Sequence, residues 1–261
     1  MGIFGKKKQE QAELPQDWVS YFSRVDSKPA SIRINLALSK VAPIKNMGMR
    51  TWFSVMLKDP DKNGFTTREE FPTICGIEDD ILAALEPMGA IMAGAVKTNG
   101  MFDMYLYSID ADGYEGAIQS VMLRYEGYKY ATDFADDAGW KDYFDFLYPS
   151  EYEYQSIQNQ KVLRQLEEHG DNPEAEREVD HWIYFSAEKE MEDYAVKAET
   201  LRYKVLSKKK LDDGKRMPYQ LNISRMDNTQ WGNVDDYVWE LIELAKEHGG
   251  EYDGWGCPIA K

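Results

Sequence analysis

The sequence predicts an α+β protein built from two tandem ferredoxin-like domains, each with an antiparallel sheet and helices on one face. The chain has 261 residues, which is enough for about two domains. Hydrophobic residues make up 43% of it, enough to fill a core in each domain. The order strand, helix, strand, strand, helix, strand can be read twice along the chain, and this βαββαβ order is typical of the ferredoxin-like fold.

In the first half, alternating and helical periodicities succeed one another between residues 51 and 134. We expect strands at 51–57, 90–97, 101–109 and 128–134, helices at 67–85 and 113–125, and a leading strand at 31–38. Asn99-Gly100 stands between two of these strands, and both residues tolerate a positive φ, so it predicts a tight hairpin.

The second half repeats the order after a leading helix. We expect helices at 156–169, 186–200 and 233–248, and strands at 179–185, 203–206, 219–224 and 251–255. In a ferredoxin-like sheet the first strand is central and pairs with the fourth. Asp180, His181 and Trp182 should therefore run beside Tyr252, Asp253 and Trp255, and we take these six residues as the candidate partner-binding site.

Net charge is the most informative feature of the composition. The chain has 31 Lys and Arg against 46 Asp and Glu, a formal net charge of -15. Such a surface repels phosphate backbones, so we expect no direct binding of nucleic acid. A basic protein surface is a more suitable partner, although acidity also serves simply to keep a protein soluble.

The two cysteines, Cys75 and Cys257, fall in different predicted domains and form neither a disulfide framework nor a metal-ligand spacing. No apolar run is long enough to span a bilayer, and the first nine residues carry a lysine triplet without the apolar core of a signal peptide. We therefore expect a cytoplasmic protein that begins with a disordered segment at 1–15.

Residues 59–70 have the spacing of a calcium-binding EF-hand loop, in which alternating oxygen ligands and a final glutamate surround the ion. The candidate ligands are Asp59, Asp61, Asn63 and Glu70. The preceding residues have the pattern of a strand instead of a helix, and Pro72 follows closely, so an acidic turn between a strand and a helix is the preferred interpretation.

Residues 136–155 form an aromatic and acidic linker between the predicted domains at 16–135 and 156–261. Its aromatic side chains are suited to anchoring a partner. A short helix at 140–147 that docks against both sheets is the interpretation we prefer.

No catalytic motif of the hydrolase, nucleotide-binding or metalloprotease types is present, and we expect neither enzymatic activity nor a cofactor. The histidines His169 and His248 come at predicted helix ends, where the helix dipole favours them. His181 is the open case. Paired with Asp253 it would suit proton or metal chemistry, but a buried, hydrogen-bonded histidine that braces the last strand is commoner.

Residues 248–256 (HGGEYDGWG) end a helix with two glycines and begin a short aromatic strand. This motif resembles the C-terminus of the RraB family, the regulators of ribonuclease E activity. Residues 167–171 (EEHGD) and 180–185 (DHWIYF) match the family's first helix and strand, and the resemblance covers about 156–261. It implies a non-enzymatic protein that binds and restrains a ribonuclease E-like enzyme or another component of RNA degradation.

The first half resembles a bacterial domain family of unknown function that is often found ahead of RraB-like domains. The resemblance is carried by Asp17-Trp18 and by residues 29–32, 63–65, 69–70 and 77–79. It adds no mechanism. The alternative function is therefore a small-molecule or calcium-binding protein acting through this domain, and a hydrolase using His181 and Asp253 ranks last.

Overall fold

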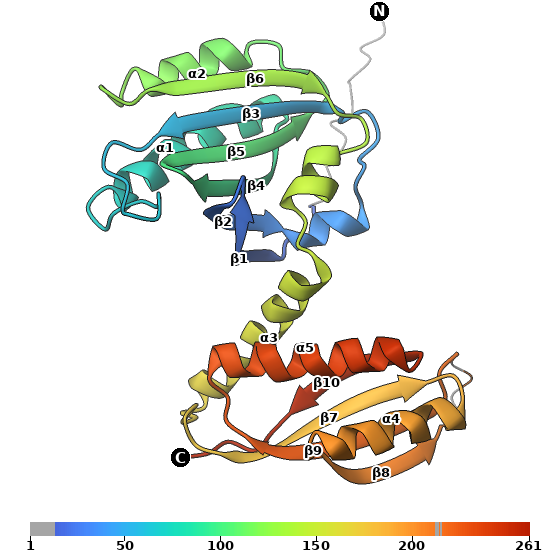
Figure 1. Ribbon diagram of the computed structural model, residues 1–261. Coiled ribbons are helices and arrows are strands. Elements are labelled where there is room, and N and C mark those ends of the chain that lie inside the picture. Colours follow the sequence, from blue (N-terminus) through green and yellow to red (C-terminus); the bar gives the residue numbers. More distant parts are fainter. Residues whose placement is uncertain (1–13, 212–213, 215) are drawn as a thin grey trace, which may run out of the picture. The chain divides into compact units, whose positions relative to one another are not determined.

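The computed structural model describes residues 14–211, 214 and 216–261, and most of the segment expected to be disordered lies outside this range. The chain divides into two compact units, Met1–Glu153 and Tyr154–Lys261 (Figure 1). Each unit contains one antiparallel sheet packed against helices, so the α+β class is as predicted. None of the helices in the described part of the chain is long and apolar enough to cross a membrane.

The N-terminal unit has a sheet of six strands in the order β1-β2-β4-β5-β3-β6, where a four-stranded sheet was expected. The strands are β1 (Trp18–Val25), β2 (Lys28–Asn35), β3 (Met49–Met56), β4 (Ile91–Thr98), β5 (Met101–Ser108) and β6 (Tyr130–Asp136). The difference is the hairpin β1-β2, which pairs with the edge of β4. The predicted turn at Asn99-Gly100 is confirmed, with φ of 50° and 78°.

Two helices, α1 (Phe71–Leu85) and α2 (Tyr114–Met122), cover one face of this sheet. Their buried stripes, including Ile77, Ile81 and Ile118, pack against Phe53 and Met104 of the central strands. Short 3-10 turns follow β2 and α1, at η1 (Leu36–Lys40) and η2 (Glu86–Met88).

The aromatic segment expected as a linker covers the opposite face of the same sheet. It contains a π-helical turn, η3 (Asp142–Leu147), in place of the expected α-helix. Trp140 stacks on Tyr107 of β5 with ring centroids 4.0 Å apart, and its indole N–H donates to the carbonyl of Met47 at 2.7 Å. The hydroxyl of Tyr143 donates to the carbonyl of Asn35 at 2.9 Å. Helical segments therefore lie on both faces of the N-terminal sheet, not on one.

The C-terminal unit contains the predicted succession of elements after its leading helix α3 (Glu151–Glu168). These are β7 (Arg177–Phe185), α4 (Glu188–Thr200), β8 (Lys204–Lys210), β9 (Tyr219–Asp227), α5 (Trp231–Glu247) and β10 (Gly250–Gly256). The sheet order is β10-β7-β9-β8 (Figure 1). The predicted pairing of the first and last strands is confirmed, with Trp255 opposite His181 and an irregularity between Tyr252 and Gly254.

The apolar faces of α4 and α5 form the core of this unit with alternate residues of β7 and β9. Val179, Ile183 and Phe185 point to the helices and are fully buried. Because side chains alternate along a strand, Asp180, Trp182 and Tyr184 leave β7 on the opposite face.

Candidate functional site

His181 lies in the core of the C-terminal unit, among three tyrosines. Its Nδ1 is 2.8 Å from the hydroxyl oxygen of Tyr252, and its ring packs edge-on against Tyr203 and Tyr237, each with centroids 5.6 Å away. The side chain is fully buried. The predicted neighbour Asp253 is instead exposed, so the hydrogen-bond partner that the fold gives His181 is a tyrosine.

Burial lowers the pKa of His181 to about 3, with a smaller contribution from the positive charge of Arg225. The imidazole is therefore neutral at physiological pH. Its Nε2 and the hydroxyls of Tyr203 and Tyr237 are buried without a partner among the described residues. A neutral, enclosed imidazole cannot exchange protons with a substrate in solution, and the arrangement supports the role of a brace between β7 and β10.

We expect His181 to make the C-terminal unit acid-sensitive. The unfolded chain takes up a proton at His181 below its ordinary pKa of about 6.5, whereas the folded chain does so only near pH 3. Stability contributed by neutral His181 is therefore full above about pH 6.5 and falls as the pH drops toward 3, by on the order of 4 kcal/mol in total. Urea unfolding at a series of pH values measures this slope.

The matched variants are His181→Gln, which does not titrate, and His169→Gln at an exposed position. In His181→Gln, the free energy of unfolding should depend less on pH between pH 3 and 6.5. In His169→Gln, this pH dependence should stay close to that of the wild type. Equal slopes for the wild type and His181→Gln would contradict the assignment.

Trp255, also predicted to contact a partner, is turned inward. Its indole N–H donates to Oδ1 of Asn159 at 3.0 Å, and the amide of Asn159 donates to Asp235 at 2.8 Å. Ser156 donates to the same carboxylate at 2.6 Å. These bonds join α3, α5 and β10 within the C-terminal unit, so Trp255 holds the terminal strand in place.

The loop with calcium-like spacing is organised by its own backbone. Both carboxylate oxygens of Glu70 accept backbone N–H groups, from Lys58 at 2.7 Å and Asp59 at 3.1 Å. Asp61 accepts N–H groups of Asn63 and Phe65. The described residues contain no group of three or more His, Cys, Asp or Glu side chains placed to hold a metal ion. Calcium binding by this loop stays a prediction, and titration of the protein with calcium would test it.

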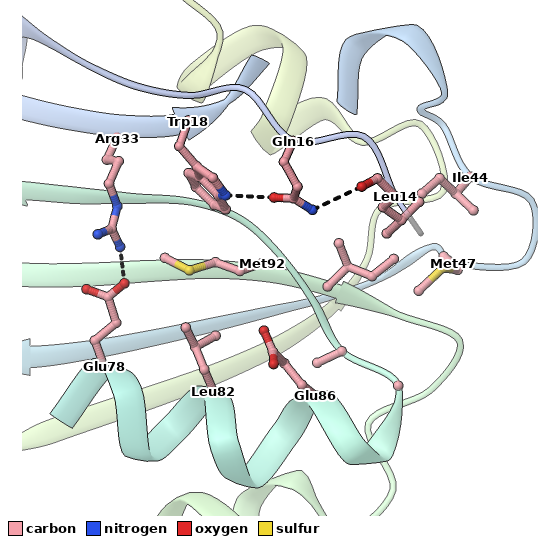
Figure 2. A pocket seen from close by; sticks show the side chains of 13 residues that line it. Leu14, Gln16, Trp18, Arg33, Ile44, Met47, Glu78, Leu82, Glu86 and Met92 are labelled. Atoms are coloured by element: carbon pink, nitrogen blue, oxygen red, sulfur yellow. Dashed lines mark hydrogen bonds and ion pairs between the residues drawn. The ribbon is translucent and has the colours of Figure 1, made fainter. Parts of the chain in front are cut away.

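An open groove lies in the N-terminal unit, between α1 and the hairpin β1-β2. It encloses about 830 Å³. Most of its lining is apolar, as is usual for small-molecule sites. The apolar lining residues include Leu14, Ile44, Met47, Leu82 and Met92, and Figure 2 shows them around the space between the helix and the strands.

The polar groups of this groove are few, and they come from β1 and the residues just before it, β2, α1 and η2. Arg33 of β2 forms an ion pair with Glu78 of α1, across one end of the groove (Figure 2). The Arg33 guanidinium also lies 5.6 Å from the ring centroid of Trp18, whose indole N–H donates to Gln16 at 2.7 Å. Glu86, the first residue of η2, lines the groove about two helical turns beyond Glu78.

Arg33 was not named from the sequence, and Trp18 was named only for the family resemblance and not as a site residue. The available signal was the alternation of Ser31, Ile32, Arg33 and Ile34, which places Arg33 on the face opposite the buried isoleucines. That pattern does not show which helix covers the other face.

The geometry thus defines an α+β protein with two antiparallel sheets, an open apolar groove in the first unit and a closed histidine-tyrosine core in the second. The chain belongs to the DUF695 family of unknown function, whose model matches residues 16–148. A domain of the family "Regulator of ribonuclease activity B" (RraB) follows at residues 156–257. Both resemblances predicted from the sequence are confirmed.

No curated protein matches the chain. Among solved structures, the crystal structure of an unknown protein from Galdieria sulphuraria aligns with 14% sequence identity. The alignment covers 81% of this chain and 99% of that one, with a TM-score of 0.23.

Proposed function

We propose that this protein is a noncatalytic, cytoplasmic regulator that binds a ribonuclease E-type enzyme through its C-terminal unit. The observation that carries the proposal is the match of residues 156–257 to the RraB family. We assign this unit a ferredoxin-like fold, which its βαββαβ order and its strand order β10-β7-β9-β8 support. In the N-terminal unit, the order β6-β3-β5-β4 supports the same fold with a hairpin added at the edge.

Charge on the outside of the helices supports a basic partner. The outward faces of α4 and α5 carry exposed acidic residues. They are Glu188, Glu192, Asp193, Glu199, Asp236, Glu240, Glu243 and Glu247. Complementary potential of this kind accelerates encounter and selects among partners.

Of the six residues expected at the partner surface, we retain Asp180, Trp182 and Asp253. Asp180 and Trp182 share the face of β7 that α4 and α5 leave open. The ring of Trp182 lies across β10, 3.6 Å from the position that a Cβ on Gly256 would take. Trp182 and Asp180 are half-buried on this open face. An aromatic ring beside a carboxylate on such a face is the type of anchor that contributes most to protein interfaces.

The test is titration calorimetry of the full-length protein with the ribonuclease E-type enzyme of the same organism, over a salt series. We expect binding that weakens as salt increases, and Trp182→Ala should weaken it about tenfold or more. Trp231→Ala removes a tryptophan that is 49% exposed elsewhere in the unit, and it should leave the affinity within about twofold.

Cleavage of a single-stranded RNA by the enzyme, with and without the protein, shows whether binding regulates activity. No binding at low salt would overturn the proposal. If both tryptophan variants weaken binding equally, the enzyme would still be the partner, but the open sheet face around Trp182 would not be the binding surface.

A further inference from the structure

Strand β1 forms one edge of the N-terminal sheet, and among the described residues no strand pairs with its outer side. All eight of its residues pair with β2 in one unbroken register, from Trp18 opposite Asn35 to Val25 opposite Lys28. A continuous edge of this kind presents a row of unpaired N–H and C=O groups. Such a row is a template for pairing with a further strand.

The other three edges of the two sheets carry features that oppose such pairing. β6 contains two aspartates, β8 contains four lysines, and the pairing of β10 with β7 is irregular between Tyr252 and Gly254. Charges and bulges are the usual protection of an edge strand against association. β1 has no acidic residue, lysine, proline or glycine, and Arg24 is its one charged residue. It is therefore the least protected of the four edges.

The hairpin shows which backbone groups of β1 point outward. Its two-residue turn, Asp26-Ser27, has φ of 49° and 64°, and a turn of this type is closed by a hydrogen-bonded pair to which Val25 belongs. At the other end of the strand, the N–H of Leu36 donates to the carbonyl of Asp17 at 2.9 Å. Hydrogen-bonded pairs alternate along an antiparallel ladder, so the odd-numbered residues bond to β2 and the even-numbered ones point outward. The outward residues are Trp18, Ser20, Phe22 and Arg24.

The side chains of these four residues share one face of the sheet and are exposed. Trp18 is 41% exposed and Phe22 is 63% exposed. Tyr21 points to the other face, where it is buried and its hydroxyl donates to the carbonyl of Leu147 at 2.8 Å. The strand is thus held in place by its own unit while it presents two large aromatic side chains beside an open backbone edge. Aromatic residues are enriched in protein interfaces and contribute most to their affinity.

We propose that this edge joins two copies of the protein, through antiparallel pairing of β1 with β1 about a two-fold axis at Tyr21. In this register Trp18 lies opposite Arg24 of the second copy, and Ser20 lies opposite Phe22 of the second copy. Symmetry repeats both pairs. Each pair joins two outward-pointing residues, as the ladder requires.

The register is also favourable for charge. The single cation of each strand meets a tryptophan ring and not a like charge, and contacts between cations and aromatic rings are attractive. The surface is therefore complementary to itself, which is the condition for a two-fold interface. This dimer is separate from the proposed regulator function, and neither depends on the other.

The test is sedimentation velocity of the full-length protein from about 1 µM to about 200 µM, where mass action converts monomer into dimer. Phe22→Lys places a lysine on the exposed face of the edge strand and should weaken dimerisation about tenfold or more. Leu123→Lys is the matched control, because Leu123 belongs to the same unit and is 76% exposed but lies outside β1. It should leave the dissociation constant within about twofold.

A monomer at every concentration would overturn the proposal and leave the edge to a strand from another protein. Equal weakening by Phe22→Lys and Leu123→Lys would also overturn it.

Residue-resolved hydrogen exchange of the wild type tests the backbone pairing without a substitution. The amides of Ser20 and Phe22 should gain protection as the concentration rises and the dimer forms, because they point outward. The amide of Tyr21, which bonds to β2, should be protected at both ends of the series. A dimer that forms without added protection at Ser20 and Phe22 would place the interface elsewhere and contradict the proposal.

Discussion

Replacing Arg177 by methionine should destabilise the C-terminal unit by about 3 to 5 kcal/mol. Arg177 and Asp171 form an ion pair in which the two side chains are only 5% and 3% exposed. Asp171 also accepts the N–H of Ala260 at 2.8 Å and the hydroxyl of Thr229 at 3.2 Å. Without Arg177, a buried carboxylate keeps its neutral donors but loses its counter-charge. Urea unfolding of the full-length variant measures the loss.

The double variant Arg177→Met, Asp171→Asn is the control, because it removes the charge that the single variant leaves unpaired. The double variant should lose clearly less free energy of unfolding than the sum of the losses in the two single variants. Additive losses would show that the pair does not act as a unit. Residue-resolved hydrogen exchange should place the weakened protection in β7 and the C-terminal residues that Asp171 holds.

The same pair contributes to acid sensitivity. Burial raises the pKa of Asp171, but hydrogen bonds from Ala260, Arg177 and Thr229 outweigh it and hold the pKa below its usual range. Stability from Asp171 is thus present above the unfolded pKa of about 3.9 and is lost as the pH falls through the lower folded value. This window lies at more acidic pH than most of the loss expected from His181.

Replacing Trp140 by alanine should destabilise the N-terminal unit by about 3 to 5 kcal/mol. The side chain is fully buried and stacks on Tyr107 with an interplanar angle of 9°. Its removal leaves a large cavity over the sheet and an unpaired carbonyl at Met47, which now accepts the indole N–H. Hydrogen exchange should show the loss in β3 and β5.

Trp18→Ala is the matched control, since Trp18 belongs to the same unit but is 41% exposed. It should cost about 1 kcal/mol or less. Trp140→Phe keeps a ring on Tyr107 but loses the hydrogen bond and part of the indole volume, so the destabilisation should be intermediate. Similar losses for Trp140→Ala and Trp18→Ala would contradict the structural role assigned to Trp140.

Turns and helices that are specified by residues close together in the sequence could be predicted from it. Asn99-Gly100 specifies its hairpin through local φ preferences, and helical stripes located α1 and α5. Strand β1 was missed because its apolar residues fall on both faces. Trp18 and Phe22 are exposed, while Tyr21 is buried, so no alternation marks the strand.

The candidate sites depend on contacts between distant residues, and local spacing does not report these. Arg33 of β2 and Glu78 of α1 form their ion pair at the groove only because the helix packs on the sheet. For His181 the neighbouring strand was predicted correctly, and its hydrogen-bond partner is Tyr252 and not Asp253, which the alternative with proton or metal chemistry would have required. The irregularity between Tyr252 and Gly254 leaves Asp253 exposed and gives the bond to Tyr252. The aromatic residues at 140–148 were assigned to a linker. Their composition indicates that they are buried against something, but it does not specify which sheet they cover.

The packing of Trp140 and η3 on the N-terminal sheet has a consequence for how such two-part chains are assembled in evolution. A gene fusion that joined a new C-terminal domain directly after β6, at Asp136, would uncover the buried face formed by Tyr107 and its neighbours. A domain joined beyond Leu147 would leave that face covered, and the DUF695 match extends to residue 148. The N-terminal folding unit therefore includes its aromatic closing segment.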